Sequence, residues 1–327
     1  MVRGHGHPVA GPGAGPGGAG QLGVSGRRRC RPVRLGEQRV GLTLTVLGCD
    51  GGYPAPGGAA SGYLVRGAGT TLWLDAGPGT LANLQRHVSL DELDAVVLSH
   101  EHPDHRSDVE GLAVALSLGG SRPGTAPCGV AVDGRPSLPV YAPAGLAGQV
   151  YHDGSPGLTW HEVAEGDRIR VGGLDLVFSR TDHGPPTLAV RVDGDGACLG
   201  YSADSGPAWS LEALGTDLDL ALCEATYCAR DEGRSQHMSA RQAATSAVEA
   251  GVRHLVVTHR WPTVSAEEVF EEASEAWGRP VDQARMGATW EVGAPAPGPV
   301  GSPPPPGSMI VRATGDDPTG RAIGGRL

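Results

Sequence analysis

Short apolar runs that end near a histidine or an acidic residue recur through the middle of the chain. The first run covers residues 93–98 and leads directly into Ser-His-Glu-His-Pro-Asp-His at positions 99–105. Runs of this length that are rich in Val and Leu are typical of buried strands in α/β proteins. Loops after the carboxyl ends of such strands are where metal and ligand sites collect. The pattern therefore predicts an α/β fold with a site at its strand ends.

The segment 99–105 is the strand end richest in metal-binding chemistry. It contains four strong ligands, namely His100, His102, Asp104 and His105. Imidazole and carboxylate together suit zinc and similar metals. In an extended segment the first two histidines point the same way, and Pro103 then turns the chain, so one loop can serve two adjacent metals. A His-rich surface loop is the alternative, but three of the 12 histidines of the chain fall within six positions here.

Three later apolar runs also lead to a residue that can bind a metal. These residues are His183, Asp204 and His259. Each of them alone is more often a cap or a turn residue than a ligand. Their joint occurrence after the first motif, in the order His, Asp, His, favours one shared site, because a catalytic zinc needs three protein ligands.

These seven positions resemble the signature of the metallo-β-lactamase-fold hydrolases over about residues 41–292. The resemblance implies a four-layer αββα fold with a dinuclear zinc site between two sheets. One metal is then held by His100, His102 and His183. The other is held by Asp104, His105 and His259, with Asp204 as the bridge and a metal-bridging hydroxide as the nucleophile. The expected cofactor is two Zn²⁺ per chain, with Mn²⁺ or Fe²⁺ as alternatives, and the full ligand set disfavours the mononuclear iron oxygenases of the family.

A second pair of residues bears on the reaction. In ribonuclease Z and its phosphodiesterase relatives, a strand-end Glu-Ala-Thr and a later His form a pair, which Glu224 and His237 resemble. The resemblance implies that His237, near its unperturbed pKa, protonates the leaving oxygen and that Glu224 orients it. A capping histidine and a buried structural carboxylate are the alternatives. We count Asp104, Glu224 and His237 as the candidate catalytic residues.

Charge and spacing bear on the substrate. Asp204 follows His183 by only 21 positions, which leaves no room for the long RNA-clamping arm often inserted there in ribonuclease Z. Residues 41–292 contain 16 arginines and 33 acidic residues, a formal net charge of −17, which disfavours nucleic acid as a partner. The opening at residues 47–65 looks similar to actinobacterial atypical cyclic-nucleotide phosphodiesterases. We therefore expect a small-molecule phosphodiester such as cyclic AMP.

Other functions stay open at this point. The alternatives are a ribonuclease Z-like endoribonuclease, a thioester or lactone hydrolase of the same fold, and a regulatory module without activity. Arg106 and Arg260 flank metal ligands, and either can steer a phosphate or be an ordinary surface residue.

The ends of the chain differ in composition from its middle. Residues 1–40 and 293–327 are rich in Gly and Pro and are expected to be disordered tails around one hydrolase domain at 41–292. Neither an exporting signal nor a run of about 18 apolar residues is present, so we expect a cytoplasmic protein without a membrane span. The insertion at 119–139 either overhangs the site or forms a homodimer face, and the sequence leaves both open.

Overall fold

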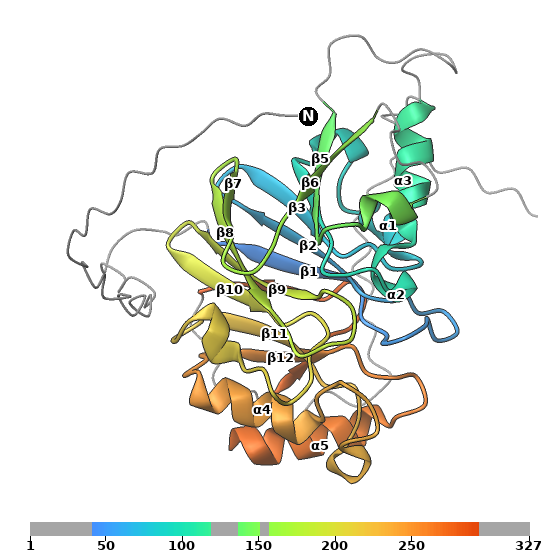
Figure 1. Ribbon diagram of the computed structural model, residues 1–327. Helices are drawn as coiled ribbons and strands as arrows, with labels where there is room; N and C mark the ends of the chain where they lie inside the picture. Colours follow the sequence, from blue (N-terminus) through green and yellow to red (C-terminus); the bar gives the residue numbers. More distant parts are fainter. Residues whose placement is uncertain (1–40, 119–136, 151–156, 294–327) are drawn as a thin grey trace, which may run out of the picture. The chain divides into compact units, whose positions relative to one another are not determined.

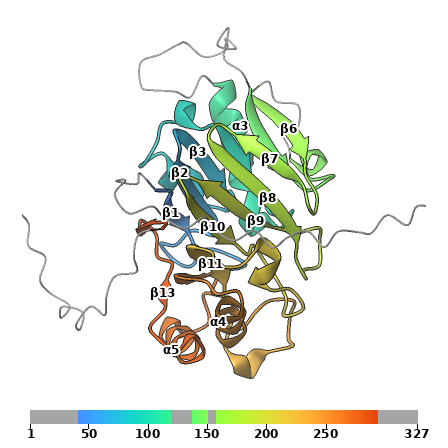
Figure 2. The same ribbon diagram turned by 90° about the vertical axis from the view of Figure 1, so that its left-hand side faces the viewer.

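The computed structural model describes residues 41–118, 137–150 and 157–293 (Figure 1). The two predicted tails lie outside the described residues apart from Gly293, and so do residues 119–136 of the predicted insertion. Within the described part of the chain, the strands form two sheets of seven strands each. The two sheets lie face to face, as the view in Figure 2 also shows.

The first sheet has an antiparallel half and a parallel half. In spatial order its strands are β14 (Thr289–Glu291), β1 (Thr43–Gly48), β2 (Gly62–Gly67), β3 (Thr70–Leu74), β4 (Ala95–Val97), β5 (Leu138–Ala142) and β6 (Leu158–Glu162). The pairs from β14 to β3 are antiparallel, and those from β3 to β6 are parallel. The carboxyl ends of β3 and β4 therefore meet at the same edge of the sheet.

The second sheet repeats this division. In spatial order its strands are β13 (Asp282–Gln283), β12 (Leu255–Thr258), β11 (Leu220–Glu224), β10 (Ala197–Tyr201), β9 (Leu188–Gly194), β8 (Leu174–Arg180) and β7 (Arg168–Val171). The pairs from β13 to β10 are parallel, and those from β10 to β7 are antiparallel. Strands β10, β11 and β12 are buried along their whole length, which explains why their sequences are almost continuously apolar.

Helices cover the outer faces of both sheets (Figure 1). The described helices are α1 (Thr80–Leu84), α2 (Pro103–Arg106), α3 (Asp108–Ser117), α4 (Ala240–Glu249) and α5 (Ala266–Trp277). Short 3₁₀ turns occur at Leu90–Glu92, Ala147–Gln149, Leu211–Leu214 and Ala229–Asp231. One apolar core lies between the sheets, a second between α4, α5 and the second sheet, and a third between α1, α3 and the first sheet. This confirms the predicted four-layer αββα fold.

Helix α4 begins at Ala240, because Ser239 caps it and exchanges side-chain and backbone hydrogen bonds with Gln242. The end of the predicted insertion differs from the observed boundary. Strand β5 begins at Leu138, so the last residues of the predicted insertion belong to the sheet. Among the described residues, no helix is long and apolar enough to cross a membrane.

Candidate metal centre

The seven predicted ligands come together where the two sheets face each other. His100 and His102 follow β4, and Pro103 then starts the short helix α2, which carries Asp104 and His105. The other three ligands, His183, Asp204 and His259, follow β8, β10 and β12. His102 is half-buried, and the other six are buried. Residues up to 159 positions apart in the sequence thus share one site because their strands end at the same edge.

The ligands fall into two groups. The first contains His100, His102, His183 and Asp204, and the second contains Asp104, His105 and His259. In each group, one ligand atom from every residue lies within 4.8 Å of the others. The two groups have the membership that the sequence predicts for the two metals, and Asp204 belongs by its other oxygen to the second as well.

Asp204 connects the groups because its two carboxylate oxygens face in different directions. Oδ2 lies 3.5 Å from Nε2 of His100 and 3.8 Å from Nε2 of His183. Oδ1 lies 3.1 Å from Nε2 of His105 and 3.2 Å from Nε2 of His259. One carboxylate oxygen for each group is the arrangement that a bridging ligand requires.

The donor atoms fit a pair of cations better than they fit one another. Nε2 of His100 and Oδ1 of Asp204 are buried and have no hydrogen-bond partner among the described residues. Such orphaned polar atoms are costly unless something else satisfies them. Nε2 of His105 and Nε2 of His259 lie only 3.2 Å apart, so two lone-pair donors converge on one region. Imidazole and carboxylate donors in this number suit zinc and similar divalent metals.

Hydroxyl, carbonyl and carboxylate groups orient the imidazoles. Asp75, buried and placed directly after β3, has its Oδ2 2.7 Å from Nδ1 of His105. Ser99 donates its hydroxyl to the same oxygen at 2.8 Å and lies 2.9 Å from Nδ1 of His100. The hydroxyl of Tyr201 donates to Oδ2 of Asp75 as well, at 2.6 Å. The contacts with Ser99 and Asp75 occupy Nδ1 of His100 and of His105 and leave Nε2 of each ring for a metal.

Two further ligands are held in the same manner. Nδ1 of His183 lies 3.0 Å from the carbonyl oxygen of Gln236. Nδ1 of His259 lies 3.0 Å from the hydroxyl of Thr226. The carboxylate of Asp104 accepts the backbone N–H of Gly52 at 2.8 Å. Contacts of this kind fix the ring or carboxylate orientation before a metal binds, which lowers the entropic cost of binding.

Electrostatics prepare two of the ligands, His100 and Asp204, for metal binding. Burial lowers the pKa of His100 well below its usual value, and the neighbouring His105 lowers it further. Burial raises the pKa of Asp204, but His105 and His259 outweigh this effect and hold the pKa well below its ordinary value. A neutral imidazole and an ionised carboxylate are the forms that bind metals.

Glu224 and His237 form a contact pair beside the ligands. Glu224 ends β11 and is fully buried, and its two carboxylate oxygens lie 3.1 and 3.2 Å from Nδ1 of His237. The hydroxyl of Thr226 and the backbone N–H groups of Ser205 and Met238 donate to the same carboxylate. The ring of His237 stacks on that of His259 at 5.3 Å between centroids. The predicted pair is therefore assembled next to the second ligand group.

The pKa of His237 differs from our expectation. Burial lowers this pKa, but the charge and hydrogen bonds of Glu224 outweigh burial and raise it to about 9. The expected unperturbed value is therefore wrong, because the sequence does not show how closely the two side chains approach. At neutral pH this histidine carries a proton that it can donate.

The model of the Beta-lactamase superfamily domain matches residues 70–260. This range covers more than half of the chain and contains all seven ligands as well as Glu224 and His237. The chain belongs to the β-lactamase superfamily of metallo-hydrolases.

Individual relatives support the same assignment. An uncharacterised protein of Mycobacterium tuberculosis (strain H37Rv) is 35% identical over 274 residues, which cover 81% of this chain and 98% of the relative. The probable metallo-hydrolase YhfI of Bacillus subtilis is 30% identical over 255 residues, 76% of this chain and 100% of the relative. The ribonuclease Z of Methanopyrus kandleri is 27% identical over 275 residues, 72% of this chain and 93% of the relative.

A solved structure shows the same fold. The crystal structure of YhfI from Bacillus subtilis, described as a metallo-β-lactamase fold protein, superposes with a TM-score of 0.67 at 28% identity. The match covers 76% of this chain and 99% of YhfI. Together with the relatives, it confirms the predicted metallo-hydrolase family and the relationship to ribonuclease Z.

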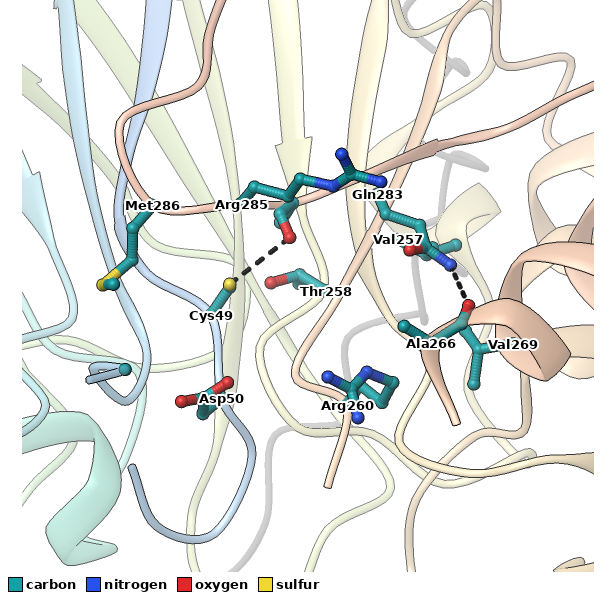
Figure 3. A pocket seen from close by; sticks show the side chains of 12 residues that line it. Cys49, Asp50, Val257, Thr258, Arg260, Ala266, Val269, Gln283, Arg285 and Met286 are labelled. Atoms are coloured by element: carbon teal, nitrogen blue, oxygen red, sulfur yellow. Dashed lines mark hydrogen bonds between the residues drawn. The ribbon is translucent and has the colours of Figure 1, made fainter. Parts of the chain in front are cut away.

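The two arginines beside metal ligands, Arg106 and Arg260, donate hydrogen bonds to backbone carbonyl oxygens. Arg106 donates through Nε to the carbonyl oxygen of Glu101 at 2.7 Å. Arg260 donates through Nη1 to the carbonyl oxygens of Trp261, at 3.0 Å, and Val264. Arg260 also lines a pocket of about 390 Å³ together with Cys49 (Figure 3). None of the seven candidate ligands is among the residues that line this pocket.

Asp75 is the site residue that our sequence reasoning missed. It is fully buried, has a φ of 55°, and contacts His105, Ser99 and Tyr201. A signal was present, because Asp75 directly follows an apolar strand, as the ligands do. Its partner Tyr201 lies 126 positions away, and no sequence pattern joins the two.

Proposed function

We propose that the chain is a dinuclear zinc-dependent phosphodiesterase whose substrate is a 3′,5′-cyclic nucleotide such as cyclic AMP. The observation that carries the proposal is the contact of buried Glu224 with His237, at 3.1 Å, beside two groups of metal ligands. A thioester releases a thiolate, which can leave without a proton, whereas cleavage to an alkoxide calls for a proton donor in addition to the metals.

The metal ligands divide between two positions, with Asp204 shared. Bound metals supply positive charge to the phosphate and lower the pKa of water. Asp75, Ser99 and Thr226 keep the ligand rings in place. The contribution of these residues is preorganisation, because the rings do not have to turn when the substrate arrives.

His237 supplies the proton for the leaving oxygen. Its Nδ1 is engaged by Glu224, which leaves Nε2 as the nitrogen that can donate to a substrate. His237 also belongs to a group with Asp204 and His259 whose ligand atoms lie within 4.8 Å of one another. We assign it to proton transfer rather than to metal binding, because a pKa of about 9 keeps its ring protonated at neutral pH, whereas a metal-binding imidazole must be neutral.

The charge of the domain supports a small substrate. A formal net charge of −17 over residues 41–292 repels a polyanionic backbone over its whole length, whereas one phosphodiester interacts mainly with the metals. Cleavage of RNA is the second candidate, because the Methanopyrus kandleri relative is named ribonuclease Z. A thioester or lactone substrate remains the third.

A hydrolysis panel with one active-site variant tests the proposal. Zinc-loaded protein and its His237→Ala variant are assayed on cyclic AMP, cyclic GMP, a precursor transfer RNA, a glutathione thioester and a β-lactam. We expect turnover of a cyclic nucleotide, reduced about 10²–10⁴-fold in the variant. Metal analysis by mass spectrometry should find about two zinc ions per chain in both proteins.

His87→Ala is the matched control, because His87 is exposed and lies outside both ligand groups. It should keep full activity and both metals. Silence on every phosphodiester, or full activity of the His237 variant, contradicts the proposal. Cleavage of the transfer RNA at its 3′ trailer without cleavage of cyclic nucleotides promotes the ribonuclease instead.

A further inference from the structure

Trp261 stands beside the candidate general acid and has no role in the metal centre. It lies two residues after His259, and its indole is half-buried. Its ring centroid is 6.0 Å from that of His237, with an interplanar angle of 75°. The ring centroid of Tyr227 lies 5.7 Å from that of Trp261, also in an edge-to-face arrangement. A large, partly exposed aromatic side chain thus adjoins the group that is proposed to protonate the leaving oxygen.

The backbone of Trp261 is fixed from both directions. Its N–H donates to the carbonyl oxygen of Thr226 at 3.1 Å. Its carbonyl oxygen accepts from Arg260 at 3.0 Å and from the N–H of Val264 at 2.9 Å. A residue held at both its N–H and its C=O presents its side chain in one place, which is what a recognition surface needs.

The other edge of the indole faces the loop that contacts a metal ligand. A β-carbon placed on Gly52 would lie 3.8 Å from both Cδ1 and Nε1 of Trp261. The N–H of Gly52 donates to Asp104 at 2.8 Å. Trp261 therefore lies between His237 and a loop in contact with the second ligand group, on the rim of the site.

The indole of Trp261 is accessible to a ligand at the rim of the site. The side chain is partly open to solvent. An exposed aromatic ring beside reacting groups commonly contacts a ligand, because tryptophan gains both area and a hydrogen bond there. The neighbour of a general acid is the leaving group and whatever is attached to it.

We propose that Trp261 is a specificity-determining residue that stacks on the base of a nucleotide substrate while His237 protonates the leaving oxygen. The inference rests on the proposed phosphodiesterase function and adds the recognition of a planar ring to it. Aromatic stacking on a base tolerates different bases, since every base has a flat face. Trp261 should therefore select nucleotides over other phosphodiesters more strongly than it selects adenine over guanine.

The test compares two substrates with the same scissile bond. One is cyclic AMP, and the other is ribose 3′,5′-cyclic phosphate without a base. For Trp261→Ala we expect KM for cyclic AMP to rise about tenfold or more, with kcat changed less than about threefold, in line with the loss of one stacked base. The kinetic constants for the abasic substrate should stay close to those of the unchanged protein.

Two further variants keep the result interpretable. Trp261→Phe retains a flat ring and should restore most of the preference for cyclic AMP, which also covers the case in which the alanine variant fails to fold. Phe270→Ala removes another partly exposed aromatic ring, on α5, and should change neither substrate.

The outcomes separate the inference from the function on which it rests. Equal losses on both substrates in the Trp261 variants mean that Trp261 acts through packing on His237, and they overturn the inference while the phosphodiesterase function stands. An unchanged preference for cyclic AMP overturns it too. Failure of the unchanged protein to cleave either cyclic phosphate overturns the proposed function, and this inference with it.

Discussion

Two buried carboxylates, Asp75 and Glu224, make similar contacts in the candidate site, but the histidines that they contact have different proposed roles. Asp75 contacts His105 directly and reaches His100 through the hydroxyl of Ser99. Glu224 contacts His237 directly and reaches a metal ligand, His259, through the hydroxyl of Thr226 at 2.5 Å. Both thus combine one direct histidine contact with one relayed contact.

The difference lies in the proposed role of the histidine that each carboxylate contacts. His105, beside Asp75, is a candidate metal ligand, so the carboxylate should strengthen metal binding by making the imidazole more basic. His237, beside Glu224, is the candidate general acid, and the same electrostatic effect raises its pKa and keeps it protonated. One structural device therefore serves metal affinity in one half of the site and proton transfer in the other.

The largest effect is expected at Glu224. Glu224→Gln keeps the shape of the side chain but removes the charge, so His237 loses the partner that keeps it protonated and oriented. Turnover of the phosphodiester should fall about 10²-fold, while zinc content and affinity stay near those of the unchanged protein. Steady-state kinetics and metal analysis on the same preparations measure both quantities. Loss of zinc together with activity would erase the distinction between the two carboxylates.

Asp75 should behave in the opposite way. Asp75→Asn should lower zinc affinity about 10–100-fold, because the imidazole of His105 becomes less basic. Competition with a chromophoric chelator measures the affinity, and excess zinc should restore much of the turnover. Ser99→Ala is the graded control, since it cuts only the relay to His100 and should weaken only one of two binding steps. Activity that stays low in saturating zinc would give Asp75 a role beyond metal binding.

A smaller effect is expected on the pH profile. A general acid works only while it is protonated, and Glu224 raises the pKa of His237 to about 9. Turnover should therefore hold through neutral pH and fall as the pH rises through that range. In Glu224→Gln the raising charge is gone, so the fall should move to lower pH by about one unit or more. An alkaline limb that does not move would show that a group other than His237 sets it.

Local sequence was enough to predict the ligands and the elements that carry them. His100, Asp204 and His259 stand at or just after the ends of buried strands, and a strand end is recognisable from a short apolar run. The exact start of α4 is set by a local contact. Ser239 caps the helix through its hydrogen bonds with Gln242, so the helix begins at Ala240.

The sequence by itself predicted the candidate metal centre of this protein, because each candidate ligand is marked by its residue type and its place after an apolar strand. Tertiary structure decided how that chemistry is tuned. The contacts of Asp75 with Tyr201 and of Gly52 with Asp104 join segments from different strands, and so does the approach of Trp261 to His237. Electrostatic and stacking interactions depend on distance in space, and only the folding of these strands and loops into one site brings the groups within range.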